Sequence, residues 1–75
     1  MVAYYFDYAV KARVRNAHRV DYDLECGVRI EASGTKTVVW RGLRADDGAP
    51  VGPWTDDRAA AWADAHPTPL AIEGE

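Results

Sequence analysis

Three carboxylates occupy alternate positions in one short segment, at Asp21, Asp23 and Glu25. Such oxygen ligands bind hard cations like calcium or magnesium when the backbone curves enough to gather about six of them. Alternate spacing is instead typical of a flat strand, on which these acids would pair with cations of a neighbouring strand. We therefore expect no metal site here.

A second acidic motif, Asp46-Asp47-Gly48, contains part of a calcium-binding loop. The positions that follow hold Ala49, Pro50 and Val51, which offer no side-chain oxygen. The motif therefore predicts a plain turn. Gly48 and Gly52 also lack the spacing of a phosphate-binding loop, so we expect no cofactor of any kind.

The candidate nucleophile and the candidate bases form no recognisable motif. The chain has one cysteine, Cys26, and two histidines, His18 and His66. Cys26 is expected to point into the core from the middle of a strand, where a thiol is inert. His18 is expected at a hairpin tip and His66 at a helix end. Because one small sheet with one helix rarely encloses a pocket, we predict a protein that is not an enzyme.

Two long alternating runs, residues 4–14 and 20–32, are the elements that would position these side chains. Each run has apolar residues at even positions and mostly polar residues at odd positions. A period of two with one apolar face is typical of a half-buried strand. We predict two strands joined at Ala17-His18-Arg19, with their even sides in the core. The residues expected to be buried are Phe6, Tyr8, Leu24, Val28, Ile30 and Trp62, and those expected to be exposed are Lys11, Arg13, Asp21 and Asp23.

Charges on the odd side predict the register of these two strands. A register in which opposed residue numbers sum to 36 aligns four pairs of opposite charge, and a register that sums to 34 aligns fewer. Each such pair stabilises a sheet by about 0.2–1 kcal/mol. The expected pairs are Arg15–Asp21, Arg13–Asp23, Lys11–Glu25 and Asp7–Arg29.

A third strand is predicted from Thr35 to Leu43, after a turn at Ser33-Gly34. A three-residue loop with Gly34 in the left-handed conformation would turn Val38 and Trp40 inward. A two-residue loop would turn Thr37, Val39 and Leu43 inward instead. The first loop is favoured because it buries Trp40.

The remaining sequence predicts a loop, a helix and a tail. Residues 42–54 contain three glycines and two prolines, which indicate a loop. Thr55 is the expected N-cap of a helix that has Asp56 and Asp57 in its first turn and ends at His66-Pro67. The predicted fold class is α+β, a three-stranded antiparallel meander followed by one C-terminal helix. Residues 1–67 would form this single domain, and residues 68–75 an extended tail.

Targeting signals are not recognised. The N-terminus has no basic region followed by an apolar segment, and no apolar run approaches the ~20 residues that span a bilayer. A single cysteine is typical of a reducing compartment. We expect a cytoplasmic protein without a membrane partner.

Association with another protein chain is the function favoured by this plan. A meander has two open edges, and one short helix covers little of an apolar face. We expect a small accessory or assembly domain whose partner is most simply a second copy, giving a homo-oligomer. The expected partner-binding residues are Tyr4, Phe6, Tyr8, Leu70 and Ile72.

Nucleic-acid binding is the alternative. Sheets that present cations and aromatic rings on an open face bind DNA or RNA. The interleaved acids and the net charge of −3 disfavour this alternative, because they repel phosphate. The residues expected on this face are Tyr5, Lys11, Arg13, Arg15, Arg29 and Arg41.

Overall fold

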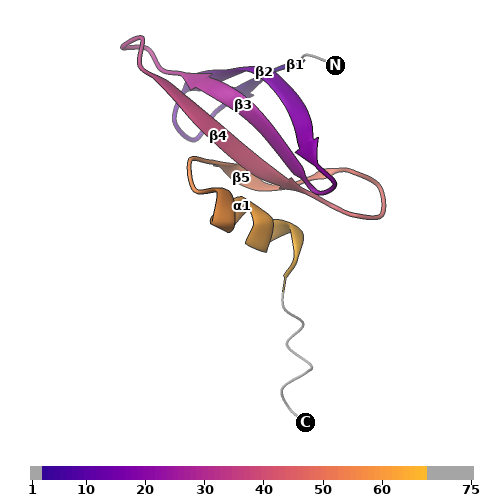
Figure 1. The fold of residues 1–75 in the computed structure, drawn as a ribbon. Coiled ribbons are helices and arrows are strands. Elements are labelled where there is room, and N and C mark those ends of the chain that lie inside the picture. Colours follow the sequence, from indigo (N-terminus) through magenta and orange to yellow (C-terminus); the bar gives the residue numbers. More distant parts are fainter. Residues whose placement is uncertain (1–2, 68–75) are drawn as a thin grey trace.

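One antiparallel sheet and one helix make up the part of the chain, residues 3–67, that a computed structural model describes (Figure 1). Each strand pairs with the next along the chain, so the sheet has the order β1-β2-β3-β4-β5. The predicted three-stranded meander is therefore wrong. The elements are β1 (Ala3–Asp7), β2 (Ala12–Asp21), β3 (Leu24–Ile30), β4 (Lys36–Leu43), β5 (Pro50–Thr55) and α1 (Arg58–Ala65).

The first alternating run is two strands, because a turn at residues 8–11 divides it. The Asp7 carboxylate accepts a hydrogen bond from the Ala9 amide at 3.1 Å, and Lys11 adopts a positive φ of 56°. β2 then runs through residues 17–19, which were predicted to be a hairpin tip. The turn contains no glycine or proline, and the alternation of side chains continues across it, so the periodicity concealed it.

Pairing across the turn reverses the predicted face of β1. Tyr5 lies opposite Val14 on β2, and Val14 is fully buried. The odd residues of β1 therefore share the buried face with the even residues of β2. Phe6 and Tyr8, which were predicted to be buried, are 48% and 82% exposed.

The register of β2 and β3 also differs from the predicted one. Arg13 lies opposite Ile30, and a bulge follows at Asn16, which has a φ of 59°. The true turn is at Tyr22-Asp23, and Asp23 is buried rather than exposed. Of the four predicted charge pairs, Asp7–Arg29 alone forms an ion pair within residues 3–67. Leu24 is buried and Lys11, Arg13 and Asp21 are exposed as predicted, whereas Val28 and Ile30 are half-buried.

The loop between β3 and β4 has the predicted geometry, but the predicted face is wrong. Gly34 has a φ of 91° and donates its N–H to the Glu31 carbonyl at 2.8 Å, which closes a three-residue loop. This loop places Gly27 opposite Val39. Because the odd residues of β3 face inward, Val39 is fully buried and Val38 is exposed.

β5 lies where a loop was predicted. It pairs with β4 at the edge of the sheet, where prolines such as Pro50 and Pro53 are tolerated. Gly52 adopts a φ of 81° beside an irregularity in this pairing. The preceding turn at Asp46-Asp47 is as predicted. The Asp47 carboxylate accepts hydrogen bonds from the Ala49 amide and the Arg44 side chain, and these bonds, the first most of all, lower its pKa.

The sheet curls so that its two end strands approach each other. Tyr5 of β1 and Trp54 of β5 have ring centroids 5.8 Å apart, although three strands separate them in the sheet order. The core that this curl encloses contains Val14, Ala17, Val39 and Trp54, with Tyr5 packed against it. We call this side of the sheet the inner face and the opposite side the outer face.

The helix packs against β4 and β5 and covers one end of the outer face (Figure 1). A Cβ atom at Gly42 would lie 2.6 Å from the Ala61 carbonyl oxygen, so glycine is required for this approach. Asp57, not the predicted Thr55, is the N-cap, and the helix ends at Ala65 before His66. α1 is the one helix among residues 3–67. It is neither long nor apolar enough to cross a membrane.

Candidate functional site

The inner face holds charges that were predicted to lie on an open surface. Arg41 donates to the Glu25 carboxylate at 2.8 Å, and its guanidinium carbon lies 4.2 Å and 4.5 Å from the ring centroids of Tyr5 and Trp54. Arg29 donates to the Asp7 carboxylate and to the Trp54 carbonyl oxygen, both at 2.9 Å. Three residues of the predicted nucleic-acid face, Tyr5, Arg29 and Arg41, are therefore internal.

These internal charges stabilise the curl and offer no reactive group. Asp7 and Glu25 each already accept from an arginine, and the Tyr5 hydroxyl also donates to Glu25 at 3.4 Å. No group of three or more potential metal ligands occurs within residues 3–67. The side chains that are free to bind a ligand therefore lie on the outer face.

The outer face carries the remaining cations of the predicted site. Phe6 lies opposite Arg13 on β2, and Arg13 lies opposite Ile30 on β3, so the three side chains form a row across the strands. One step along, Arg15 lies opposite Val28, and Lys36 of β4 lies opposite Ile30. We define the outer patch as Tyr4, Phe6, Lys11, Arg13, Arg15, Val28, Ile30, Glu31 and Lys36.

Aromatic rings on β1 lie beside cations on β2 within the outer patch. Tyr4 is 60% exposed, and the Arg15 guanidinium lies 5.6 Å from its ring centroid. Phe6 makes an edge-to-face contact with Tyr8 at a centroid distance of 4.7 Å. Exposed rings flanked by guanidinium groups can stack with planar groups and attract anions.

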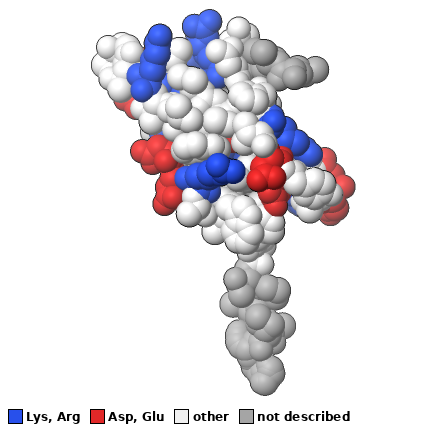
Figure 2. Space-filling model, viewed as in Figure 1, with Lys and Arg blue, Asp and Glu red and all other residues white. Residues whose placement is uncertain are grey.

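The cations of the outer patch have no acidic partner among residues 3–67. Lys11, Arg13, Arg15 and Lys36 take part in none of the ion pairs formed among residues 3–67. Of the other cations, Arg29, Arg41, Arg44 and Arg58 each have a carboxylate within 4.0 Å, while Arg19, beside Gly48, forms no ion pair within residues 3–67. Figure 2 shows Lys and Arg side chains at the end of the molecule farthest from the helix, while most Asp and Glu side chains gather lower, beside other cations. The patch is thus locally basic on a chain with a net charge of −3.

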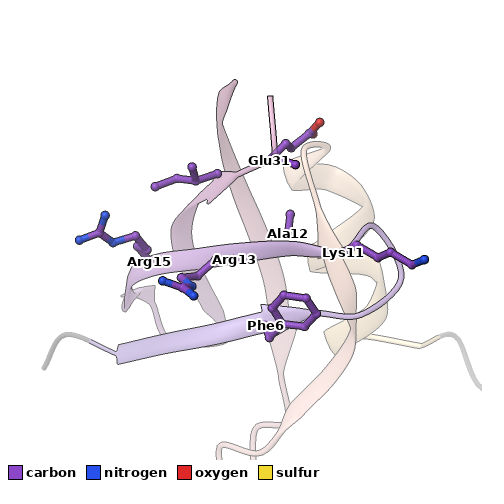
Figure 3. Close-up of a pocket in the computed structure, with 8 residues that line it drawn as sticks. Phe6, Lys11, Ala12, Arg13, Arg15 and Glu31 are labelled. Carbon is purple, nitrogen blue, oxygen red and sulfur yellow. The ribbon is translucent and has the colours of Figure 1, made fainter. Parts of the chain in front are cut away.

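Two neighbouring depressions hollow the outer patch. The first, about 250 Å³, has Phe6, Lys11, Arg13, Arg15, Ile30 and Glu31 in its lining. The second, about 260 Å³, is lined by Arg15, Asn16, Val28, Ile30 and Lys36. Figure 3 shows Lys11 and Arg15 at opposite ends of the first depression, with Phe6 and Arg13 between them. Arg15 and Ile30 belong to both linings.

Some predicted residues lie elsewhere, and some of the site was missed. Tyr8 lies in the turn after β1, and Leu70 and Ile72 lie outside the described residues. Lys36 and Ile30 were not predicted as site residues. The three-residue loop predicted at Gly34 contained the necessary signal, because it places Ile30 directly opposite Lys36.

His18 lies on β2 opposite Cys26 of β3, and its Nδ1 hydrogen-bonds with the Asn16 carbonyl oxygen at 2.9 Å. Cys26 is half-buried, and burial raises the pKa of its thiol. His66 contacts the Asp23 carboxylate at 2.5 Å and the Trp62 carbonyl oxygen at 2.9 Å, and it stacks on the Trp62 ring. This histidine therefore ties the helix end to the turn between β2 and β3.

Comparisons with known proteins give no match from which a function could be inferred. No protein-family model matches the chain, and neither a curated protein nor a solved structure matches it.

Proposed function

We propose that this protein is a non-catalytic binding module that holds a nucleic-acid chain on its outer patch. The observation that supports this is a group of four cations that form no ion pair within residues 3–67 and are set among exposed aromatic rings on an antiparallel sheet. Phosphate groups are bound by lysine and arginine, and bases stack on aromatic and guanidinium faces. The patch combines both kinds of contact.

The main argument against nucleic acid was the presence of acids between the cations. Of these acids, Glu25 is engaged by Arg41 on the inner face, Asp23 contacts His66 at the helix end, and Asp21 contacts Arg58. Glu31 is the one acid in the linings of the two depressions. Separation of charge between the two faces thus supports the alternative that the linear sequence disfavoured.

The test is titration of a fluorescent oligonucleotide, followed by anisotropy, between about 50 mM and about 200 mM salt. We expect binding that weakens steeply with salt, because phosphate contacts release counterions. Arg13→Ala and Lys36→Ala should each weaken binding and reduce the salt slope by about 1.

Arg19→Ala is the matched control for these variants. Arg19 is exposed on β2, but its guanidinium lies beside Gly48 of the β4–β5 loop, away from the patch. We expect its salt slope to equal that of the unaltered protein. Absence of binding at low salt, or equal losses in the control, would overturn the proposal.

Assembly of several copies through β1 is a second candidate. β1 pairs only with β2 among the described strands, and Tyr4 and Tyr8 are exposed beside this edge. Unpaired strand edges invite another strand. Sedimentation velocity over a wide range of concentration tests this candidate: we expect a dimer that Tyr8→Ser weakens, and a strictly monomeric protein would exclude it.

A further inference from the structure

We infer that the outer patch takes a single strand rather than a duplex, with two successive unpaired bases in the two depressions and the phosphate that joins them at Arg15. This inference rests on the proposed function and specifies its ligand. It follows from the linings of the two depressions, the chemistry of their walls and the position of Arg15.

The two depressions are neighbours of similar size. They share Arg15 and Ile30, so these two side chains form the boundary between them. At about 250 Å³ and 260 Å³, each is smaller than the roughly 300–1,000 Å³ of sites for drug-sized ligands. Each therefore suits one planar ring system, and two such rings side by side fit consecutive nucleotides.

The walls of the depressions present apolar surface to a flat ring. Phe6 lines the first depression and is 48% exposed, while Val28 and Ile30 line the second. Bases inside a duplex stack on one another, so their faces are not available to protein side chains. Aromatic platforms on sheets therefore bind unpaired bases, which can leave the stack.

Arg15 is placed to bind the phosphate between the two bases. Its planar guanidinium can donate two parallel hydrogen bonds to one phosphate. Lys11 lies at the end of the first depression opposite Arg15 (Figure 3), and Lys36 lines the second depression. Each base site therefore has Arg15 and one lysine in its lining, which provides cations for the phosphates on either side of a base.

Glu31 is consistent with an unpaired base in the first depression. A carboxylate repels phosphate, but it accepts hydrogen bonds from the amino groups of bases such as cytosine. In a single strand both N–H bonds of such an amino group are free, whereas in a duplex one of them is engaged by the paired base. Asn16 provides an amide with donors and acceptors in the second depression.

The experiment compares three ligands of equal charge by anisotropy, each made as DNA and as RNA. They are an unstructured single strand of about twelve nucleotides, a self-complementary strand of the same length and base composition that folds into a hairpin, and a sugar-phosphate strand without bases. We expect the single strand to bind at least about 10-fold more tightly than either of the others. The tighter of its DNA and RNA forms identifies the physiological strand.

Variants separate base stacking from phosphate binding. Phe6→Ala should weaken single-strand binding about 5- to 100-fold with an unchanged salt slope, because stacking releases no counterions. Phe6→Tyr should retain the affinity, since the ring remains. Arg15→Ala should lower both the affinity and the salt slope. Tyr22→Ala, which alters an exposed ring in the turn between β2 and β3, should change neither.

The outcomes distinguish this inference from the proposed function. Equal binding of duplex and single strand, equal binding of the strand without bases, or equal losses in Phe6→Tyr and Phe6→Ala would overturn the single-strand inference and leave nucleic-acid binding in place. Failure to bind any of the three ligands at low salt would overturn both. Circular dichroism of each variant verifies that the sheet is retained.

Discussion

Asp7 and Arg29 form an ion pair at 2.9 Å on the inner face, although β2 separates the strands that carry them. Both side chains are almost buried, at 8% and 12% exposure. Arg29 also donates to the Trp54 carbonyl oxygen, so one guanidinium links β1, β3 and β5. The pair therefore contributes to the closure of the curl.

Asp7→Ala should lower the free energy of unfolding by about 3–5 kcal/mol, because it leaves the Arg29 charge buried without a partner. Urea unfolding followed by tryptophan fluorescence measures the change. Asp21→Ala is the control, since Asp21 contacts Arg58 at 3.8 Å and both are exposed; it should cost less than about 1 kcal/mol. Equal costs for the two variants would mean that the inner face is open to water.

Trp54 and Trp62 should differ in their contribution to stability. Trp54 is buried in the core, so Trp54→Ala should cost about 3–5 kcal/mol. Trp62 was expected to anchor the helix in the core, but it is 50% exposed and stacks on His66. Trp62→Ala should therefore cost clearly less in the same urea measurement. A larger loss from Trp62→Ala would contradict this order.

The N-terminus of α1 depends on Asp57, whose carboxylate accepts from the Ala59 amide at 3.0 Å and the Ala60 amide at 3.4 Å. Asp57→Ala should destabilise the protein by about 1 kcal/mol through the lost cap. Thermal unfolding followed by circular dichroism measures this. Asp56→Ala changes the same charge one residue earlier without removing the cap bonds, and a similar loss there would refute the assignment.

Cys26 should react slowly with alkylating reagents at neutral pH. Burial raises the pKa of its thiol above the ordinary value of 9.0, so little thiolate is present. A group whose pKa is raised by folding stabilises the fold below its unfolded pKa and loses this contribution as pH rises through the folded value. We expect alkylation to accelerate as pH rises above about 9 and to reach the rate of a free thiol in urea. A folded-state rate at pH 7 equal to that of a free thiol would contradict the burial.

Local features of the fold were predictable from the sequence. The three-residue loop at Gly34, the strand that follows it and the helix end before Pro67 all depend on residues close together in the chain. Left-handed backbone at a glycine and the helix-ending effect of proline are intrinsic properties of those residues. Three cations of the outer patch, Lys11, Arg13 and Arg15, were also recognised as a surface group.

The assignment of faces required the tertiary structure. Both sides of the sheet carry apolar residues, with Val39 inside and Val38 outside, so alternation alone does not identify the core. Lys11 and Asn16 adopt positive φ values, which are uncommon for residues other than glycine, although Asn tolerates them better than Lys. The turn at the first position and the bulge at the second change which residues face inward.

The curl of the sheet determines which charged side chains pair on the inner face. The sequence alone shows that charged side chains occupy alternate positions along the first strands, with cations in one run and acids in the next. Some of these cations and acids are therefore expected to form pairs. Only the approach of β1 to β5 decided which ones, because Arg41 can be buried only where Tyr5 and Trp54 meet around it. Because Arg29 and Arg41 neutralise the inner acids, the cations of the outer patch have no carboxylate partner left among residues 3–67. That surplus arises from pairings across several strands, which nearest-neighbour reasoning along a sequence does not contain.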